Sequence, residues 1–152
     1  MDRRFLRGFT LVEIMIVAVI IGLLAALAIP AIQKVQRRSQ NSRFANDLRV
    51  FTQAFETYSL ENGAWPPNAG GGVVPTGMSG TFKTDVWVAP TVVGGRWNWD
   101  KNLNGITAAV SVSSPTAATA QMTEIDALID DGDLRAGHFQ FISGRYMYIL
   151  QE

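Results

Sequence analysis

Few residues of this chain have the types and spacing that enzyme chemistry requires. The 152 residues include one histidine, His138, and no cysteine. A cysteine nucleophile, a cysteine-ligated zinc site and a disulfide framework are therefore excluded. No serine or carboxylate is spaced along the chain with His138 in a way that indicates a catalytic triad. The sequence predicts a protein that is not an enzyme.

One loop has side-chain oxygens at the spacing of a calcium site. Asp100–Gly105 matches the first half of a calcium loop, with an acid or amide at positions one, three and five and glycine at six. Asp100, Asn102 and Asn104 are therefore candidate Ca²⁺ ligands. Ser111 stands where the loop needs a glutamate, so a hairpin turn is the alternative interpretation. No other cofactor is predicted.

A second oxygen cluster follows a predicted helix. Asp130, Asp131 and Asp133 stand at its C-terminal end, where the helix dipole disfavours negative charge. We expect something to offset these charges. Arg135, a basic residue of a neighbouring subunit, or a cation would serve.

The N-terminal part of the chain is apolar over a length that fits a membrane. Phe9–Ile32 contains a single charged residue, and as a helix it would be roughly 36 Å long, enough to cross a bilayer core of about 30 Å. Arg3, Arg4 and Arg7 precede it. Because basic flanks stay cytoplasmic, the N-terminus should face the cytoplasm and the rest of the chain the other side.

A cleaved signal peptide is the alternative for this segment. Ala26-Leu27-Ala28 would supply its small-residue cleavage site. The apolar run is longer than an ordinary signal core, and Glu13 interrupts it near its start. Both features favour a membrane helix that is retained.

Glu13 is the residue in this segment with the most specific chemistry. A carboxylate inside a membrane costs roughly 2.5–3.5 kcal/mol on insertion scales and is usually paired and functional. The segment has no Lys or Arg to pair with it. A cut between Gly8 and Phe9 would create an α-amino group one helical turn from Glu13. Alternatively, Glu13 is protonated and neutral, or its side chain extends to the lipid headgroups.

The run Gly8–Glu13, placed after a short basic leader and before a long apolar helix, resembles the processing site of type IV prepilins and type II secretion pseudopilins. The resemblance covers roughly residues 1–65, ending with Tyr58, Gly63 and the Trp65-Pro66 pair. It implies a filament subunit that is cut and methylated by a prepilin peptidase and assembled at an inner-membrane platform. The resemblance says little about the C-terminal half.

The family resemblance also implies roles for individual residues. It implies cleavage between Gly8 and Phe9 and N-methylation of Phe9. It also implies that Glu13 pairs with the N-terminus of an adjacent subunit and so sets the register of the filament. Similar pilins carry a proline at the position of Pro30, where the helix can loosen during packing. Gly22 and Pro30 are therefore predicted kink positions.

The elements that position these residues follow from hydrophobic periodicity. One helix is predicted from Phe9 to Glu61, because large apolar residues recur at helical spacing to its end. Its second half should carry a core-facing stripe, formed by Phe44, Leu48, Phe51, Phe55 and Tyr58.

The residues after this helix are predicted to form a small antiparallel sheet and one short helix. Residues 63–80 are glycine- and proline-rich and indicate a loop. Hairpins are predicted from strands at 96–99 and 106–113, with a turn at 100–105, and from strands at 138–142 and 145–150. The range 119–129 has helical spacing.

The sequence therefore predicts an α+β fold, with a long N-terminal helix on an antiparallel sheet of about four strands. The expected parts are a leader (1–8), a membrane and assembly half of the helix (9–32), an amphipathic half (33–62) and a globular head (63–152).

We expect a helical filament of identical subunits, held first by membrane lipid in a bacterial inner membrane with its head in the periplasm. The filament would then be periplasmic or extracellular. The neutral net charge argues against a general nucleic-acid binder. The alternative function is a binding module in which exposed tryptophans stack on nucleic-acid bases or sugars; its candidates are Trp65, Trp87, Trp97 and Trp99.

Overall fold

The structure is a computed structural model that describes residues 9–152. Gly8 and the rest of the predicted leader lie outside the described residues. The chain divides into two compact units, residues 1–37 and 38–152. The helices are α1 (Leu11–Asn62), α2 (Thr84–Val88) and α3 (Thr119–Ile129); the strands are β1 (Arg96–Leu103), β2 (Ile106–Ser113), β3 (Phe139–Ile142) and β4 (Arg145–Gln151).

The 52-residue helix α1 belongs to both units and has no assigned break. It is helical at Gly22 and at Pro30, so the predicted single long helix is confirmed. A membrane helix tolerates proline because other groups can satisfy the freed carbonyl. The loosening expected at these two residues stays a prediction.

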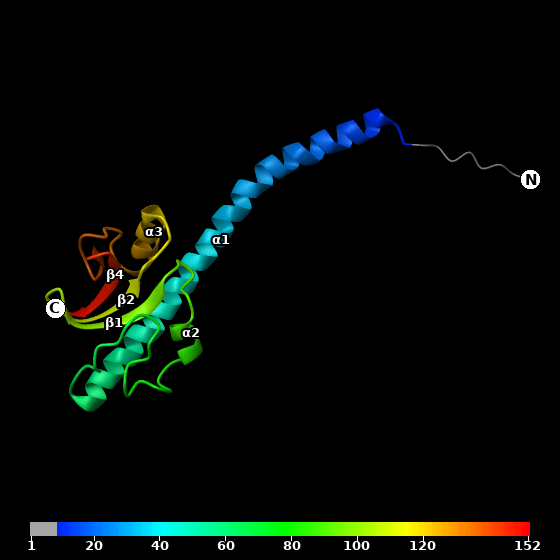
Figure 1. Ribbon diagram of the computed structural model, residues 1–152. Coiled ribbons are helices and arrows are strands. Elements are labelled where there is room, and N and C mark those ends of the chain that lie inside the picture. The colour runs from blue at the N-terminus through cyan, green and yellow to red at the C-terminus, as the bar shows by residue number, and fades with distance from the viewer. Residues whose placement is uncertain (1–8) are drawn as a thin grey trace, which may run out of the picture. The chain divides into compact units, whose positions relative to one another are not determined.

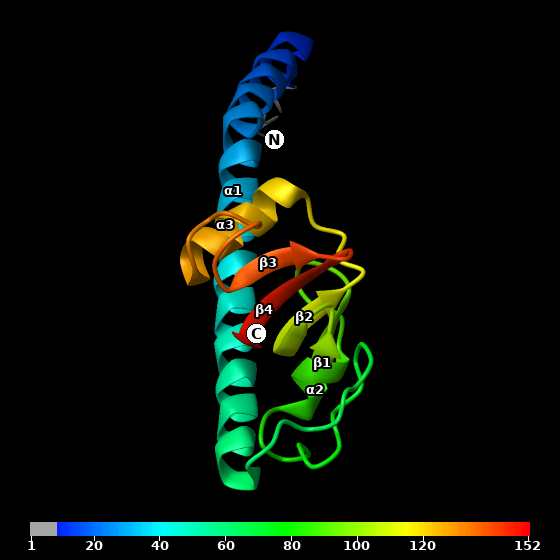
Figure 2. The same ribbon diagram turned by 90° about the vertical axis from the view of Figure 1, so that its left-hand side faces the viewer.

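The four strands of the second unit form one antiparallel sheet in the order β1-β2-β4-β3. Figures 1 and 2 show this sheet lying along the C-terminal half of α1, with α3 at one end of the sheet. The predicted α+β architecture, with a long helix on a four-stranded antiparallel sheet, is confirmed.

The core lies between α1 and the sheet and is rich in aromatic rings. Phe55 stacks on Trp99 with ring centroids 3.9 Å apart, and Phe44 stacks on Trp97 at 4.8 Å. Phe51 packs edge-on against Trp97 at 5.1 Å. The stripe predicted on the helix is therefore the face that holds the sheet.

The predicted elements of the head need two corrections. The turn expected at 100–105 is shorter, because β1 continues to Leu103 and only Asn104-Gly105 forms the turn. Both turn residues have positive φ, 54° and 82°, which suits the twist of a two-residue hairpin. The short helix α2 lies where the sequence indicated none.

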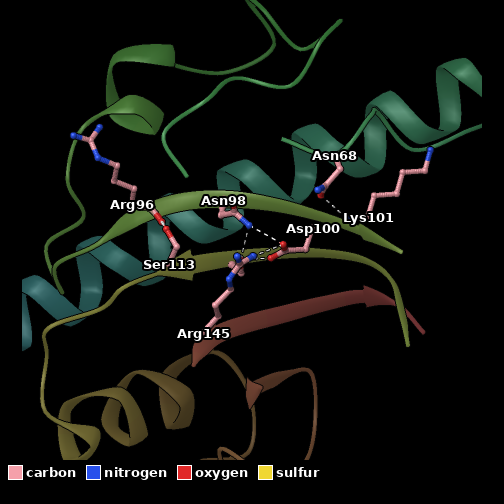
Figure 3. A network of polar contacts seen from close by, with 8 residues as sticks. Asn68, Arg96, Asn98, Asp100, Lys101, Ser113 and Arg145 are labelled. Atoms are coloured by element: carbon pink, nitrogen blue, oxygen red, sulfur yellow. Dashed lines mark hydrogen bonds and ion pairs between the residues drawn. The ribbon is translucent and has the colours of Figure 1, made fainter. Parts of the chain in front are cut away.

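The loop after α1 covers the outer edge of β1. The backbone N–H of Gly72 donates to the carbonyl of Trp97 at 2.7 Å, and that of Ala69 donates to Trp99 at 3.3 Å. Asn68 accepts from the Lys101 N–H at 3.0 Å through its side chain (Figure 3). An unpaired strand edge invites association with other strands, so this loop protects the sheet.

Candidate functional site

The candidate site is the apolar N-terminal segment and the glutamate near its start. Large apolar side chains from Leu11 to Ile32 are exposed along the described helix. None of the most apolar 18-residue window is buried, and α1 is long and apolar enough to cross a membrane. A soluble helix would bury one such face. This segment therefore needs a cover that residues 9–152 do not supply.

Glu13 and Thr10 form a reciprocal cap at the start of α1. The Glu13 carboxylate accepts the Thr10 backbone N–H and the Thr10 hydroxyl, both at 2.8 Å. The Glu13 N–H donates to Thr10 Oγ1 at 3.2 Å. This is a capping box, which satisfies backbone donors that the first turn leaves unpaired.

The capping box changes the interpretation of Glu13. The apolar segment offers no Lys or Arg to pair with its carboxylate, yet a threonine three residues earlier holds the carboxylate in place. The pattern of threonine followed three residues later by glutamate, ahead of an apolar run, is the signal that would have revealed it. Phe9 lies directly before this cap and is exposed.

The predicted calcium loop is built into the β1–β2 hairpin. Asp100 is buried in β1, and its Oδ1 accepts from Arg145 at 2.6 Å and from Asn98 at 2.8 Å (Figure 3). Ser111 donates to its other oxygen. Asn102 and Asn104 are exposed. A cation at Asp100 would have to displace an arginine, and the calcium hypothesis for this loop stays a prediction.

Arg145 is the partner of Asp100 that sequence reasoning missed. It reaches across the sheet from β4 to a carboxylate 45 positions earlier in the chain. A buried carboxylate needs such a partner, since its desolvation costs several kcal/mol. No local pattern reveals the pair, because the order of strands in the sheet brings the two residues together.

The acids after α3 are offset partly by backbone donors. Asp130 Oδ2 accepts the Phe139 N–H at 3.0 Å and also accepts the His138 N–H. Asp131 Oδ1 accepts the Asp133 N–H at 2.8 Å. His138 Nδ1 lies 3.1 Å from the Ile149 carbonyl of β4. This contact gives His138 a structural role beside the β3–β4 pair.

The tryptophans do not form the exposed platform of the alternative function. Trp97 is 2% exposed, and Trp87 and Trp99 are fully buried. Trp99 donates to the Pro66 carbonyl at 3.1 Å, and Trp87 to Val73 at 2.8 Å. Three of the four rings are therefore core residues. The hypothesis of a binding module based on exposed tryptophans is wrong, because the aromatic stripe of α1 covers them.

Comparison with known proteins supports the interpretation of the N-terminal segment. A family model described as the prokaryotic N-terminal methylation motif matches residues 3–29. The fimbrial protein EcpC of Eikenella corrodens is 42% identical over 84 residues, which are 55% of this chain and 54% of that protein. No solved structure matches the chain.

The relatives include a type IV pilin and a type II secretion system protein. The type IV major pilin protein PilE1 of Neisseria gonorrhoeae is 38% identical over 95 residues, covering 60% of this chain and 53% of the pilin. The type II secretion system core protein G of Pseudomonas aeruginosa is 39% identical over 66 residues, covering 43% and 46%. The chain spans about half the length of the curated relatives it matches.

Proposed function

We propose that this chain, a member of the type IV pilin and type II secretion pseudopilin family, is a structural subunit of a helical filament. The observation that carries the proposal is the uncovered apolar half of α1, with Glu13 fixed at its start and a head that has its own core. Membrane lipid covers this segment before assembly, and the same segments of neighbouring subunits cover it afterwards.

The proposed assembly explains why two segments of one helix pack against different partners. From Phe44 onward, α1 is held by the sheet of its own head. The segment before it is free to pack against other copies of itself. Contacts between different surfaces of identical subunits close into a ring only when the rotation between subunits allows it. When the rotation does not close, the same contacts build a helical filament.

Processing is the first step of the proposed pathway. A prepilin peptidase cuts between Gly8 and Phe9 and methylates the new Phe9 amine, and an inner-membrane platform then assembles the subunit. The N-terminus faces the cytoplasm and the head the periplasm until assembly. The new amine lies one turn from Glu13 of its own chain. In the proposed filament, Glu13 of one subunit pairs instead with the amine of the next and sets the register.

We expect intact-mass analysis of the mature protein to show a chain that begins at Phe9 with one added methyl group. The experiment uses cells that contain the peptidase. A Gly8→Leu variant should accumulate as the uncut precursor, because a small residue is expected at this bond. A mature chain that begins at Ile29 would instead establish a signal peptide and contradict the filament proposal.

A further inference from the structure

Cations gather where the apolar segment of α1 ends. Residues 33–46 contain no acid and four cations, which are Lys34, Arg37, Arg38 and Arg43. In the proposed topology, this stretch follows the membrane segment on the periplasmic side. Cations near a membrane helix are usually concentrated on its cytoplasmic side. A basic cluster on the opposite side therefore needs a physical reason.

Two of these cations share a stripe of the helix with an amide and a proline. Gln33, Lys34 and Arg37 follow Pro30 at spacings of three, four and seven residues, which places all four on one helix face. The four residues are exposed. Together they line a surface hollow of about 410 Å³. Two cations and a neutral donor therefore border one space, beside a proline whose compact ring leaves room.

The hollow lies at the depth of the lipid headgroups. The apolar run ends at Ile32, so Lys34 and Arg37 are about 3 Å and about 7.5 Å beyond it along the helix. The headgroup region extends roughly 5–7 Å from each side of the hydrocarbon core. In the other direction the same stripe continues through Leu27 and Leu23, which are both exposed. The stripe is thus basic at headgroup depth and apolar at acyl-chain depth.

We propose that Gln33, Lys34 and Arg37 bind the phosphate of an anionic phospholipid in the periplasmic leaflet. The inference rests on the proposed function, in which lipid covers the apolar segment before assembly. The Lys34 ammonium and the Arg37 guanidinium donate to phosphate oxygens, and a guanidinium has five donors, enough to serve a phosphate besides another partner. The Gln33 amide adds a neutral donor. The acyl chains of the same lipid molecule lie along Leu27 and Leu23.

Charge should make this site prefer an anionic lipid to a zwitterionic one. The headgroup of phosphatidylglycerol carries only the negative phosphate, whereas the choline cation of phosphatidylcholine is repelled by Lys34 and Arg37. Each Lys or Arg near an anionic membrane surface changes the affinity about fivefold. Two such cations therefore predict a preference of at least about tenfold for phosphatidylglycerol.

The test is native mass spectrometry of the full chain, released from micelles that hold equal amounts of dioleoyl phosphatidylglycerol and dioleoyl phosphatidylcholine. The ratio of the two lipids that stay bound should favour phosphatidylglycerol at least about tenfold in wild type and about fivefold less in Lys34→Gln. Lys34→Arg keeps the charge and should keep the ratio. The matched control is Arg49→Gln, since Arg49 is exposed on the same helix about 22 Å beyond Lys34 and outside the headgroup layer.

The outcomes separate this site from the proposed function. Equal amounts of the two lipids on wild type, or the same ratio in wild type and Lys34→Gln, would overturn the site and leave the filament subunit untouched. Added inorganic phosphate should not change the ratio, because the acyl chains also hold the lipid. Loss of phosphatidylglycerol to free phosphate would overturn the lipid assignment. A chain that retains neither lipid would contradict the lipid cover of the apolar segment itself.

Discussion

Thr10 and Glu13 show how one carboxylate can have two uses. In the single chain, the Glu13 carboxylate caps the first turn of α1 through Thr10. In the proposed filament, the Phe9 amine of a neighbour becomes a stronger partner because it carries a positive charge. The cap keeps Glu13 oriented at the helix start before that partner arrives.

Removing the Thr10 hydroxyl should loosen the start of α1. The variant Thr10→Val keeps the shape of the side chain but takes away the cap, which is worth about 1 kcal/mol. The Glu13 amide should then exchange its hydrogen about fivefold faster in micelles. Thr10→Ser restores the hydroxyl and should restore the rate. Equal exchange in Thr10→Val and wild type would show that the cap is not formed.

Asp126 makes the stability of the fold depend on pH. Burial, and next the charges of Asp131, Asp130 and Asp133, raise the pKa of Asp126 from 3.8 to about 6. The backbone N–H of Gly132 lowers the pKa and offsets only part of this rise. The folded state therefore holds this proton more tightly than the unfolded state does.

The sign of the pH effect follows from that difference. Below about pH 4 both states are protonated, and the group costs the fold nothing. As pH rises towards 6, the unfolded state loses the proton first, so the free energy of unfolding should fall by about 1–3 kcal/mol. Denaturant titrations at several pH values measure this fall in the free energy of unfolding. Asp126→Asn should remove it, and an unchanged pH slope in the variant would refute the assignment.

At the scale of elements, the second half of α1 is the main support of the head. Phe51 is buried between Phe82, Trp87 and Trp97. The variant Phe51→Ala should lower the free energy of unfolding by about 3–5 kcal/mol, because it leaves a cavity in a packed aromatic core. Leu60→Ala on the same helix is the control, since Leu60 is 86% exposed. Denaturant unfolding compares them, and equal losses would contradict the proposed helix face.

Elements with strong local patterns could be predicted from the sequence. The aromatic stripe of α1, the range of α3 and the hairpin residues Ser143-Gly144 all have short-range signals, and the structure agrees with them. The helix α2 has only five residues, and no side chain caps its start. We infer that burial of Trp87 in the core stabilises this helix, and such a tertiary contact leaves no local pattern in the sequence.

The contacts that could not be predicted join residues that are distant in the chain. Arg145 meets Asp100 only because β2 lies between β1 and β4 in the sheet. Asp126 is fully buried although it lies in an acidic stretch, and no local pattern indicates that burial. The capping box, in contrast, was readable from Thr10 and Glu13 alone.

At the scale of the whole molecule, the proposed function gives the two units separate tasks. The C-terminal unit, residues 38–152, contains the described hydrophobic core. The N-terminal unit has exposed apolar side chains, which lipid or other subunits cover in the proposed function. Changes in the N-terminal unit should therefore alter assembly without unfolding the head, and this separation makes the central claim testable.

The most direct test compares the membrane and sheared-filament fractions of wild type and Glu13→Ala. Wild type should appear in the filament fraction as the mature chain. Glu13→Ala should insert, fold and be processed, since it only removes a charge from the apolar segment. It should then remain in the membrane fraction, because the pairing that sets register is lost. Equal filament yield from a fully processed Glu13→Ala would contradict the register role, and a wild-type chain absent from sheared filaments would contradict the filament function itself.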